Sequence, residues 1–494
     1  MSTAKKLLVL LLVVLTCLGA SAQAPSGDYI VPTREHNDSI AASLERLANA
    51  YMTDVNSQYE AGAFLADSVG KYKIALRYLE RGLALAREQY GDNSQPYASG
   101  LVLVARVNTR LGEYEKAMEL FNKALDYYEK EHDLNNFDVA TAYINMGYIY
   151  SVLEDHDRAI DYCQKALVVE ERIVDLADPG IATIISYLGD AYRDKGDYPM
   201  AHKQLQRALD IREKAFGPDH PLTAEIYCSI GQVYARQGDM DKALEYLMKA
   251  LSIREKTLSP DHDDIAFTLA IIANVYANQG QNDKALEYHN RALVIYEKSL
   301  GPEHPSVAVI NFNIGSILGN LGQHDKALEH YLKTLDIYQK TFGAEHQRVA
   351  TINYNIGYSL LNLGQHDQAL VYLLKALDVY DKTDASKQLD VAKAQGSIGY
   401  IYCHKKHNYN KALPYLLSAK DGFEKTIGAI NTITAENYHN LSSCYYHLKN
   451  YKAALEYANK ALQAGNATFG PKHKFTQQEK QNIDVLKALL KQKH

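Results

Sequence analysis

The segment NIGYSLLNLGQHDQAL, Asn355 to Leu370, decides the fold, because it lies almost unchanged over NIGSILGNLGQHDKAL, Asn313 to Leu328, at an offset of 42. The alanine near its end recurs with eight spacings of 42 and one of 43, at Ala75, Ala117, Ala159, Ala201, Ala243, Ala285, Ala327, Ala369, Ala412 and Ala454. A small residue precedes each alanine by twelve or, once, thirteen positions, at Ala63, Ala105, Gly147, Gly189, Gly231, Ala273, Gly315, Gly357, Gly399 and Ser442. This register predicts ten tandem repeats between about residue 51 and residue 468.

Each repeat is predicted to form two antiparallel helices. In the first helix apolar residues recur at helical spacing, as in Ile356, Leu360 and Leu363, and a glycine suited to a left-handed helix end follows at Gly364. The second helix begins two or three residues later and carries its own apolar stripe. Because one helix pair cannot bury its own apolar face, stacked repeats must share a continuous core. The chain is therefore expected to be all-α.

Three features within the repeat resemble the tetratricopeptide repeat: the spacing of twelve, a tyrosine three positions after the small residue, as at Tyr234, and a second alanine seven after the first, as at Ala250. The 42-residue period and the segment ALDIREKAFGPDHP, Ala208 to Pro221, resemble more narrowly the repeats of kinesin light chain and its bacterial relatives. The resemblance covers roughly 85 per cent of the chain. It implies a right-handed α-solenoid of about ten helix-turn-helix repeats.

Several repeats depart from this pattern, chiefly near the ends of the array. Glu154, His407 and Lys449 stand where other repeats have the turn glycine, and the ninth repeat has one extra residue in the turn around His404 to Asn410. Terminal repeats are expected to differ because they must cap the array. The predicted organisation is a signal peptide, a linker with a candidate capping helix, ten repeats and a C-terminal capping helix, at residues 1–22, 23–50, 51–468 and 469–494.

The N-terminus has the pattern of a secretory signal peptide. Lys5 and Lys6 precede an apolar run, Leu7 to Leu15, which ends near the small residues Ala20-Ser21-Ala22. The mature chain is therefore expected to be exported, either periplasmic or secreted. A lipid anchor at Cys17 is a lesser alternative, because Thr16 is a poor fit to the small residue that precedes such sites.

Composition narrows the classes of partner. The formal charge of −6 becomes −8 once Lys5 and Lys6 are removed, which argues against nucleic acid or an anionic membrane surface as a partner. The four cysteines beyond the leader have no CxxC spacing and are predicted to be small buried residues, at Cys163, Cys228, Cys403 and Cys444. No cofactor or metal is predicted.

A second recurring motif places an acid beside a histidine. GPDHP, Gly217 to Pro221, recurs at the same interval as SPDHD, GPEHP and GAEHQ, with histidines at His262, His304 and His346. Packed helices lie ~8–10 Å apart, whereas zinc ligands lie ~2.0–2.1 Å from their ion, so successive copies cannot share one metal. A single copy lacks the converging nucleophile and oxyanion donors of a hydrolytic site. The motif is better explained as helix capping, with His220 at the cap position and Pro221 in the first turn.

The resemblance implies that the first helices line a concave groove that binds extended peptides or partner helices. Counted from the small residue, offsets of −2, +1 and +5 share one face of the first helix. In repeats two, four and five this face carries charged residues, at Arg106, Arg110, Asp190, Asp194 and Arg236. In repeats six to eight it carries asparagines, at Asn274, Asn278, Asn313, Asn320, Asn355 and Asn362.

An asparagine side chain both donates and accepts hydrogen bonds, so a column of them can pair with the main chain of an extended ligand. Asn313 and Asn355 match the position at which kinesin-type repeats hold peptide backbone. Tyr358 and Tyr400 are predicted to add aromatic contacts. A solvated polar face without a ligand would have a similar composition, and this alternative stays open.

The predicted function is a non-catalytic scaffold that binds a protein or peptide. One alternative is an exported sensory or regulatory input module for a separate signalling or protease partner. A less favoured alternative is an enzyme with a site in the groove, for which no glycine-rich phosphate loop, HExxH or GxSxG sequence is present.

Overall fold

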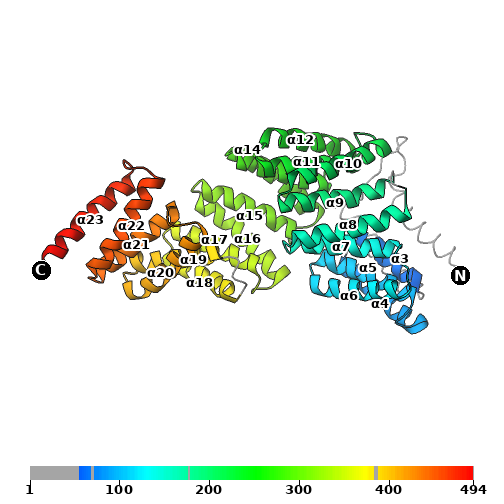
Figure 1. Cartoon of the computed structure of the whole chain (residues 1–494), viewed down its shortest axis with the longest axis horizontal. Coiled ribbons are helices and arrows are strands. Elements are labelled where there is room, and N and C mark those ends of the chain that lie inside the picture. The colour runs from blue at the N-terminus through cyan, green and yellow to red at the C-terminus, as the bar shows by residue number, and fades with distance from the viewer. Residues whose placement is uncertain (1–54, 68–71, 176–177, 383–387, 493–494) are drawn as a thin grey trace. The chain divides into compact units, whose positions relative to one another are not determined.

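The computed structural model describes residues 55–67, 72–175, 178–382 and 388–492, and all regular elements in these ranges are helices (Figure 1). The first helices of the ten repeats are α3 (Val55–Asp67), α5 (Gln95–Leu111), α7 (Phe137–Val152), α9 (Pro179–Lys195), α11 (Pro221–Gln237), α13 (Asp263–Asn278), α15 (Pro305–Asn320), α17 (Gln347–Asn362), α19 (Gln388–Tyr400) and α21 (Thr432–His447). The second helices are α4 (Tyr72–Tyr90), α6 (Tyr114–Lys130), α8 (His156–Ile173), α10 (Tyr198–Phe216), α12 (Met240–Thr257), α14 (Asn282–Ser299), α16 (His324–Phe342), α18 (His366–Lys382), α20 (Tyr409–Thr426) and α22 (Tyr451–Thr468). A final helix, α23 (Lys474–Gln492), follows. The prediction of an all-α solenoid of paired helices is confirmed.

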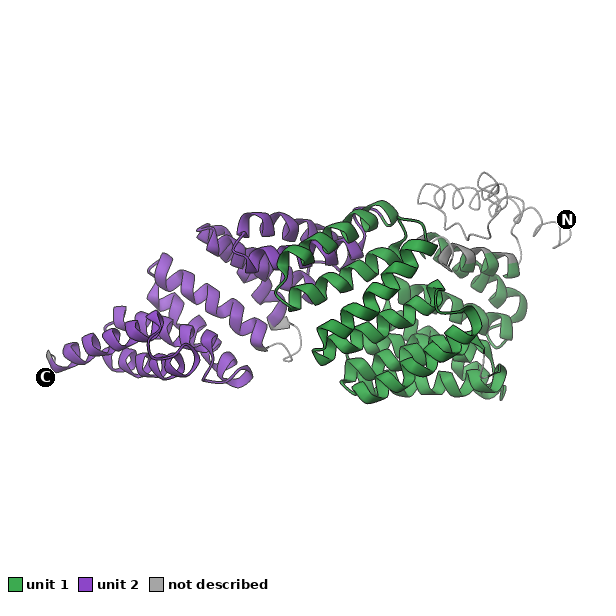
Figure 2. Cartoon of the chain, turned by 90° about the horizontal axis from the view of Figure 1, so that it is seen from above, with its two compact units in different colours: residues 1–300 green, residues 301–494 purple. Residues whose placement is uncertain are grey.

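The chain divides into two compact units, residues 1–300 and 301–494 (Figure 2). In each unit the two helices of a repeat pack on one another, and the second helix packs on the first helix of the next repeat. First helices of neighbouring repeats also touch, as α9 and α11 do in one unit and α19 and α21 in the other. Consecutive first helices from α3 to α13 in the first unit, and from α17 to α21 in the second, therefore lie side by side and present a shared face.

The repeated small residues are needed for close packing within each repeat. A Cβ atom added to Gly231 would lie 2.7 Å from Cγ of Leu247, and one added to Gly189 would lie 2.7 Å from Cγ of Leu205. Real Cβ contacts are longer than this, so a larger residue would push the two helices apart. The recurring alanine of the second helix, such as Ala243, is fully buried.

The recurring tyrosine of the first helix is packed inside its repeat in five of the repeats. Its ring stacks on a tyrosine of the second helix with centroids 5.3 to 6.1 Å apart, in the pairs Tyr150–Tyr162, Tyr234–Tyr246, Tyr276–Tyr288, Tyr402–Tyr415 and Tyr445–Tyr457. These distances are typical of favourable aromatic pairs. These five tyrosine pairs therefore contribute to packing within their repeats.

The turn between the two helices keeps its left-handed geometry even without glycine. Gly196 and Gly238 both have a φ of +86°. Glu154, His407 and Lys449, which replace the glycine, have φ values of +61°, +51° and +59°. Residues with a Cβ are disfavoured in this region, so these three turns are locally strained.

The extra residue of the ninth repeat is absorbed differently from the prediction. The spacing places it in the turn after the first helix, but in the structure a π-helix, Ile401–Lys405, directly continues α19. The backbone N–H of Lys406 donates to the carbonyl oxygen of Ile401, five residues earlier, at 3.0 Å. A π-turn holds one more residue than an α-turn, so the insertion widens the helix instead of lengthening the loop.

The predicted signal peptide, the linker and the candidate capping helix of residues 34–50 lie outside the described residues. In the described part, no helix is both long and apolar enough to cross a membrane.

Candidate partner-binding faces

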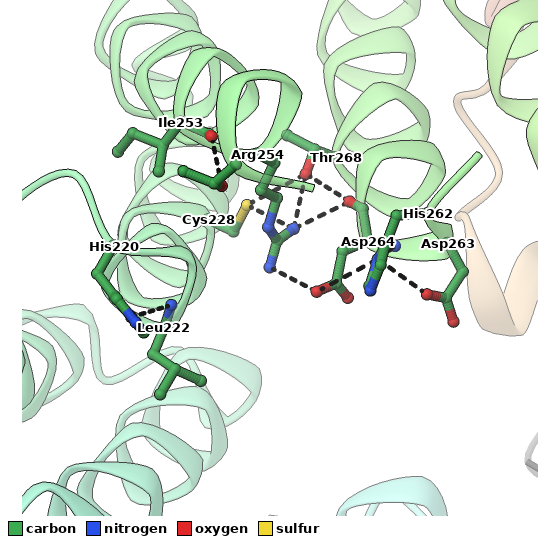
Figure 3. A network of polar contacts seen from close by, with 10 residues as sticks. His220, Leu222, Cys228, Ile253, Arg254, His262, Asp263, Asp264 and Thr268 are labelled. Carbon is green, nitrogen blue, oxygen red and sulfur yellow. Dashed lines mark hydrogen bonds and ion pairs between the residues drawn. The ribbon is translucent and has the colours of Figure 1, made fainter. Parts of the chain in front are cut away.

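The acid-histidine motifs cap helices, as predicted. His220, His262, His304 and His346 each have extended backbone angles and accept a hydrogen bond at Nδ1 from the backbone N–H two residues later, at 3.1 to 3.2 Å. Figure 3 shows this contact for His220 with Leu222. The first N–H groups of a helix have no partner within the helix, so these bonds stabilise its start.

A fifth copy of the motif was not recognised in the sequence. In GPKHK, Gly470 to Lys474, lysine replaces the acid, but His473 Nδ1 still accepts the backbone N–H of Phe475 at 3.3 Å. The ring of His473 stacks on Phe469 at 4.7 Å, as that of His220 stacks on Phe216 at 4.6 Å. The histidine is thus the constant residue of the motif and the acid is not required, while an aromatic residue four positions earlier is present in three of the five copies, at Phe216, Phe342 and Phe469.

One copy brings three groups with metal-ligand chemistry close together. Ligand atoms of His262, Asp263 and Asp264 lie within 4.8 Å of one another (Figure 3). The Nδ1 lone pair of His262 is already used, because it accepts the N–H of Asp264 at 3.1 Å. Negative charge in the first turn of α13 is also stabilised by the helix dipole. Capping therefore explains this cluster without a metal.

In the unit of residues 1–300, two of the predicted charged residues, Asp190 and Asp194, form an ion-pair cluster with Arg193 on α9. Arg193 Nη1 lies 2.5 Å from Asp190 Oδ1, and its Nε lies 3.0 Å from Asp194 Oδ1. Ser229 of α11 donates to Asp190 at 3.3 Å, and Ser151 of α7 donates to Asp194 at 3.5 Å. The cluster therefore ties together the first helices of three repeats.

The side chains of this cluster are partly buried. Burial raises the pKa of Asp190 to about 6, although the adjacent Arg193 guanidinium acts in the opposite direction. Burial likewise raises the pKa of Glu225, on α11, with Arg212 and Arg254 opposing it. Carboxylates in such surroundings lack part of their hydration, which favours contact with a cationic group.

The other predicted residues of this unit are not drawn into the cluster. Arg106 is half-buried and Arg110 is exposed on α5, and the Arg110 charge opposes the rise that burial and Glu225 cause in the pKa of Tyr187. Arg236 is exposed at the end of α11. Asn274 and Asn278 are exposed on α13. We call the set Arg106, Arg110, Asp190, Asp194 and Arg236 the charged face.

The unit of residues 301–494 carries what we call the asparagine–tyrosine face, made of Asn313, Asn320, Asn355, Tyr358, Asn362 and Tyr400 on α15, α17 and α19. Asn355 Nδ2 donates to the carbonyl oxygen of Thr351 at 2.9 Å, and Asn362 Nδ2 donates to that of Tyr358 at 2.8 Å. Each carboxamide is therefore held in one orientation. One N–H is used by its own helix, and the oxygen and second N–H are directed elsewhere.

Tyr358 is the large exposed side chain of this face. Its relative exposure is 45%, and its ring lies 6.2 Å from both Tyr354 and His324. Tyr354 hydrogen-bonds Ser397 of α19, which connects the two helices beneath the exposed ring. Tyr400 is half-buried, with its ring 4.9 Å from that of His404.

A polar extension of this face was not predicted from the sequence. His404 Nε2 lies 3.0 Å from Asn440 Oδ1, and His439 Nδ1 lies 2.5 Å from Glu479 Oε1, so α21 is linked both to the π-helix and to α23. His404 and Asn440 occupy the +5 and −2 offsets already defined for the face. Reading those offsets into the last two repeats would have found both residues.

Comparison with known proteins establishes the family. A tetratricopeptide repeat model matches residues 54–130, 138–214, 180–256, 228–298, 264–319, 306–382 and 390–467. The chain belongs to the tetratricopeptide repeat family. This helical repeat is generally a non-catalytic interaction scaffold.

Several solved structures match this chain at low identity. BtubC (BKLC) from P. vanneervenii is 22% identical, with a TM-score of 0.41, over 46% of this chain and 91% of that one. Nearly identical TPR-like repeats described as kinesin light chain, from Podosopora anserina, are 23% identical, with a TM-score of 0.37, over 42% and 99%. The apo form of the quorum sensor NprR from B. thuringiensis is 14% identical, with a TM-score of 0.47, over 74% and 98%. No curated protein matches the chain.

Proposed function

We propose that this tetratricopeptide repeat protein is a non-catalytic scaffold whose asparagine–tyrosine face binds an extended segment of a partner protein. The observation that carries the proposal is the orientation of Asn355 and Asn362 by their own helix on either side of the exposed Tyr358. An oriented carboxamide presents a donor and an acceptor to a peptide group without first losing side-chain freedom. Binding through the ligand main chain tolerates many ligand sequences.

The exposed tyrosine supplies a different part of the interaction. Aromatic side chains provide large contact area and commonly dominate the energy of protein interfaces. The ring of Tyr358 is supported from beneath by Tyr354 and at its edge by His324. A supported ring needs little rearrangement to receive an apolar ligand side chain, so the tyrosine would select for such a side chain between main-chain contacts.

Helix propensity favours a role for the exposed asparagines. Asn320 and Asn362 are exposed in the last turns of α15 and α17. Lysine or glutamine would be equally soluble there and has better helix propensity. Asparagine at both sites is readily explained if its carboxamide contacts a ligand.

A peptide library displayed on phage is a direct test, because it does not require the partner to be identified first. Enriched peptides would be measured by fluorescence anisotropy against the wild type and the double variant Asn320→Ala plus Asn362→Ala. Loss of two hydrogen-bonding side chains should raise Kd roughly 5- to 100-fold. The matched control is Gln339→Ala plus Asn410→Ala, which changes exposed residues on the second helices α16 and α20.

The control variant should bind like the wild type, and circular dichroism should show both variants folded. If the enriched peptides compete for one site and bind the wild type and the asparagine variant with equal Kd values, then Asn320 and Asn362 do not contribute to binding. Enrichment of no peptide above background would remove the face itself.

We also propose that the chain acts outside the cytoplasm, on the basis of the leader of residues 1–22. Fractionation of cells that express the full chain, followed by N-terminal sequencing, tests this point. The expected mature N-terminus is Gln23. A lipidated Cys17 would support the anchored alternative, and an intact leader in the cytoplasm would refute export.

A further inference from the structure

Three second helices of the unit of residues 301–494 expose apolar side chains. Leu332 of α16, and Val371 and Leu374 of α18, have relative exposures of 41%, 52% and 38%. Pro414 of α20 is also exposed, and Leu417 on the same helix is half-buried. We call these residues the second-helix apolar patch. The asparagine–tyrosine face lies on the first helices, so the patch is a separate surface.

The patch is the place where the sequence breaks the repeat pattern. Counted from the recurring alanine, its residues occupy the offsets +2 and +5. At +2 every other repeat has a charged residue, at Arg77, Glu119, Asp161, Lys203, Glu245, Glu287, Glu329 and Glu456. At +5 every other repeat has a polar residue or methionine, at Glu80, Asn122, Gln164, Gln206, Met248, Asn290 and Asn459. The repeat fold therefore does not require apolar residues at either offset.

Two residues of the patch also weaken their own helices. Pro414 lies inside α20, which begins at Tyr409. Proline lacks the N–H that a helix interior uses and clashes with the preceding turn. Val371 stands where a glutamate, a better helix former, is common. Apolar residues that lower helix stability and remain exposed indicate a contact with another molecule.

The patch extends across neighbouring helices. In the unit of residues 1–300, residues at these offsets meet between successive second helices, because Tyr288 Oη of α14, at +3, donates to Met248 Sδ of α12, at +5, at 4.0 Å. The same register places Leu332 of α16 beside Tyr372 of α18, and α20 follows α18 in the same way. The apolar side chains therefore form one surface and are not scattered singly.

The charged residues that border the patch have both signs. Lys333 and Asp336 border it on α16, and Lys375 and Asp378 border it on α18, and all four are exposed. Asp336 is paired with Lys340 at 2.9 Å, but exposed ion pairs of this kind contribute little and can be exchanged. A partner surface of a single charge would be repelled by one of the two signs. A second copy related by a two-fold axis has the same two signs and can place its aspartates against these lysines.

We propose that the second-helix apolar patch is a self-association surface through which two copies of the chain form a two-fold symmetric dimer. The apolar side chains form the centre of the contact and the lysines and aspartates its polar border, as is typical of homodimer interfaces. Because the patch consists of few side chains, the dimer is expected to be weak and to depend on concentration. The proposal uses the second helices alone and does not require the asparagine–tyrosine face to bind a peptide.

Sedimentation velocity of the full chain over a range of concentrations measures this association. The wild type should shift reversibly from monomer to dimer as the concentration rises. Val371→Glu plus Leu374→Gln should raise the Kd of the dimer at least ~10-fold. This variant should fold, because glutamate and glutamine occupy these offsets in other repeats. The matched control, Val168→Glu plus Val294→Glu, changes exposed valines on the second helices α8 and α14 and should leave the Kd unchanged.

Carbodiimide cross-linking of a mixture of isotope-labelled and unlabelled protein tests the geometry of the dimer. Links between copies should join Lys333 or Lys375 to Asp336 or Asp378. This experiment uses wild-type protein and carries the test by itself if the double variant does not fold. A chain that stays monomeric at every concentration overturns the proposal. So does a dimer whose Kd is the same for the folded double variant, or one whose links between copies lie on other helices.

Discussion

Nδ1 of His304 accepts the backbone N–H of Ser306 at 3.1 Å and thereby closes the N-terminus of α15. Asn136 and Asn431 make the equivalent contact at the start of α7 and α21, with carboxamide oxygens 2.8 Å and 3.0 Å from the backbone nitrogen two residues later. Different side chains thus perform one task at the same point of the repeat. The recurring histidine accepts the capping hydrogen bond, and in the repeats that begin at α7 and α21 an asparagine accepts it instead.

His304→Ala should therefore destabilise the fold by about 1 kcal/mol, because an orphaned N–H at a helix start costs this much. His304→Asn should cost less than about half of that, since its oxygen can accept the same bond. Urea unfolding followed by circular dichroism measures both. Equal losses in the two variants would argue against capping, and loss of peptide binding by a fully folded His304→Ala variant would give the histidine a role in recognition.

A second prediction concerns the strained turn at Lys449, whose φ is +59°. Other repeats have glycine at this position, and a Cβ in the left-handed region costs roughly 1–2 kcal/mol. Lys449→Gly should raise the free energy of unfolding by about 1 kcal/mol, after the greater freedom of glycine in the unfolded chain is subtracted. Lys449→Ala keeps the Cβ and is the control that should show no gain. Thermal unfolding of the three proteins decides the matter.

His289 gives the fold a specific sensitivity to acid. The side chain is fully buried in α14, and among the described residues neither ring nitrogen has a hydrogen-bond partner. Burial lowers its pKa to about 4. An unfolded histidine takes up its proton near pH ~6.5. Between about pH 6.5 and pH 4 the unfolded chain therefore binds more protons, and stability falls as the pH falls, by at most ~3 kcal/mol.

The substitution His289→Leu should raise stability and weaken this pH dependence. Leu79 and Phe121 occupy the same position in repeats whose small residue is also alanine, and both are fully buried. Urea midpoints at pH 7 and pH 5 provide the measurement. The increase in stability of His289→Leu over wild type should be larger at pH 5 than at pH 7. An increase that is equal at the two pH values would show that packing, and not protonation of His289, causes the difference in stability.

The sequence was sufficient to predict the repeat fold because each feature was repeated. A small residue, a turn glycine or a capping histidine is weak evidence once, but ten copies at a constant interval define the register and the helix faces. The same regularity concealed other features. The spacing between the sixth and seventh repeats, from Ala285 to Ala327, is the same as elsewhere, so nothing in it predicted that the units divide after Leu300.

Contacts between side chains were the part that sequence offsets could not supply. Arg254 was not singled out from the sequence, yet its side chain is buried and donates to Thr268 Oγ1 at 2.7 Å and to the carbonyl oxygen of Asp264 at 3.0 Å (Figure 3). Asp190 was predicted to face a ligand, and the structure pairs it with Arg193. The contacts of Arg254 and Asp190 depend on which side chain lies one repeat or one helical turn away. The periodicity of the sequence does not specify that side chain.

Asp190 leads to a pH dependence opposite to that of His289. Burial raises its pKa to about 6, whereas an unfolded aspartate has a pKa near ~3.9. Between about pH 4 and pH 6 the folded chain therefore binds more protons than the unfolded chain, and this residue's contribution to stability falls as the pH rises. In wild-type protein the two effects partly cancel over this window, so neither is visible in a single unfolding curve.

The substitution Asp190→Asn should remove the pH dependence that Asp190 causes and leave the one that His289 causes. The amide retains an acceptor for Arg193 or Ser229, while Arg193 keeps its contact with Asp194 at 3.0 Å. Its stability should match or exceed that of wild type at pH 7, and its loss of stability on acidification from pH 6 to pH 4 should be steeper, because only the histidine effect remains. Urea midpoints across this range measure the slope. The opposite outcome is a variant that is less stable than wild type at pH 7 and whose stability falls with the same slope as that of wild type below pH 7. It would mean that the Asp190 carboxylate stays ionised in the folded protein, because Arg193 stabilises its charge against the effect of burial.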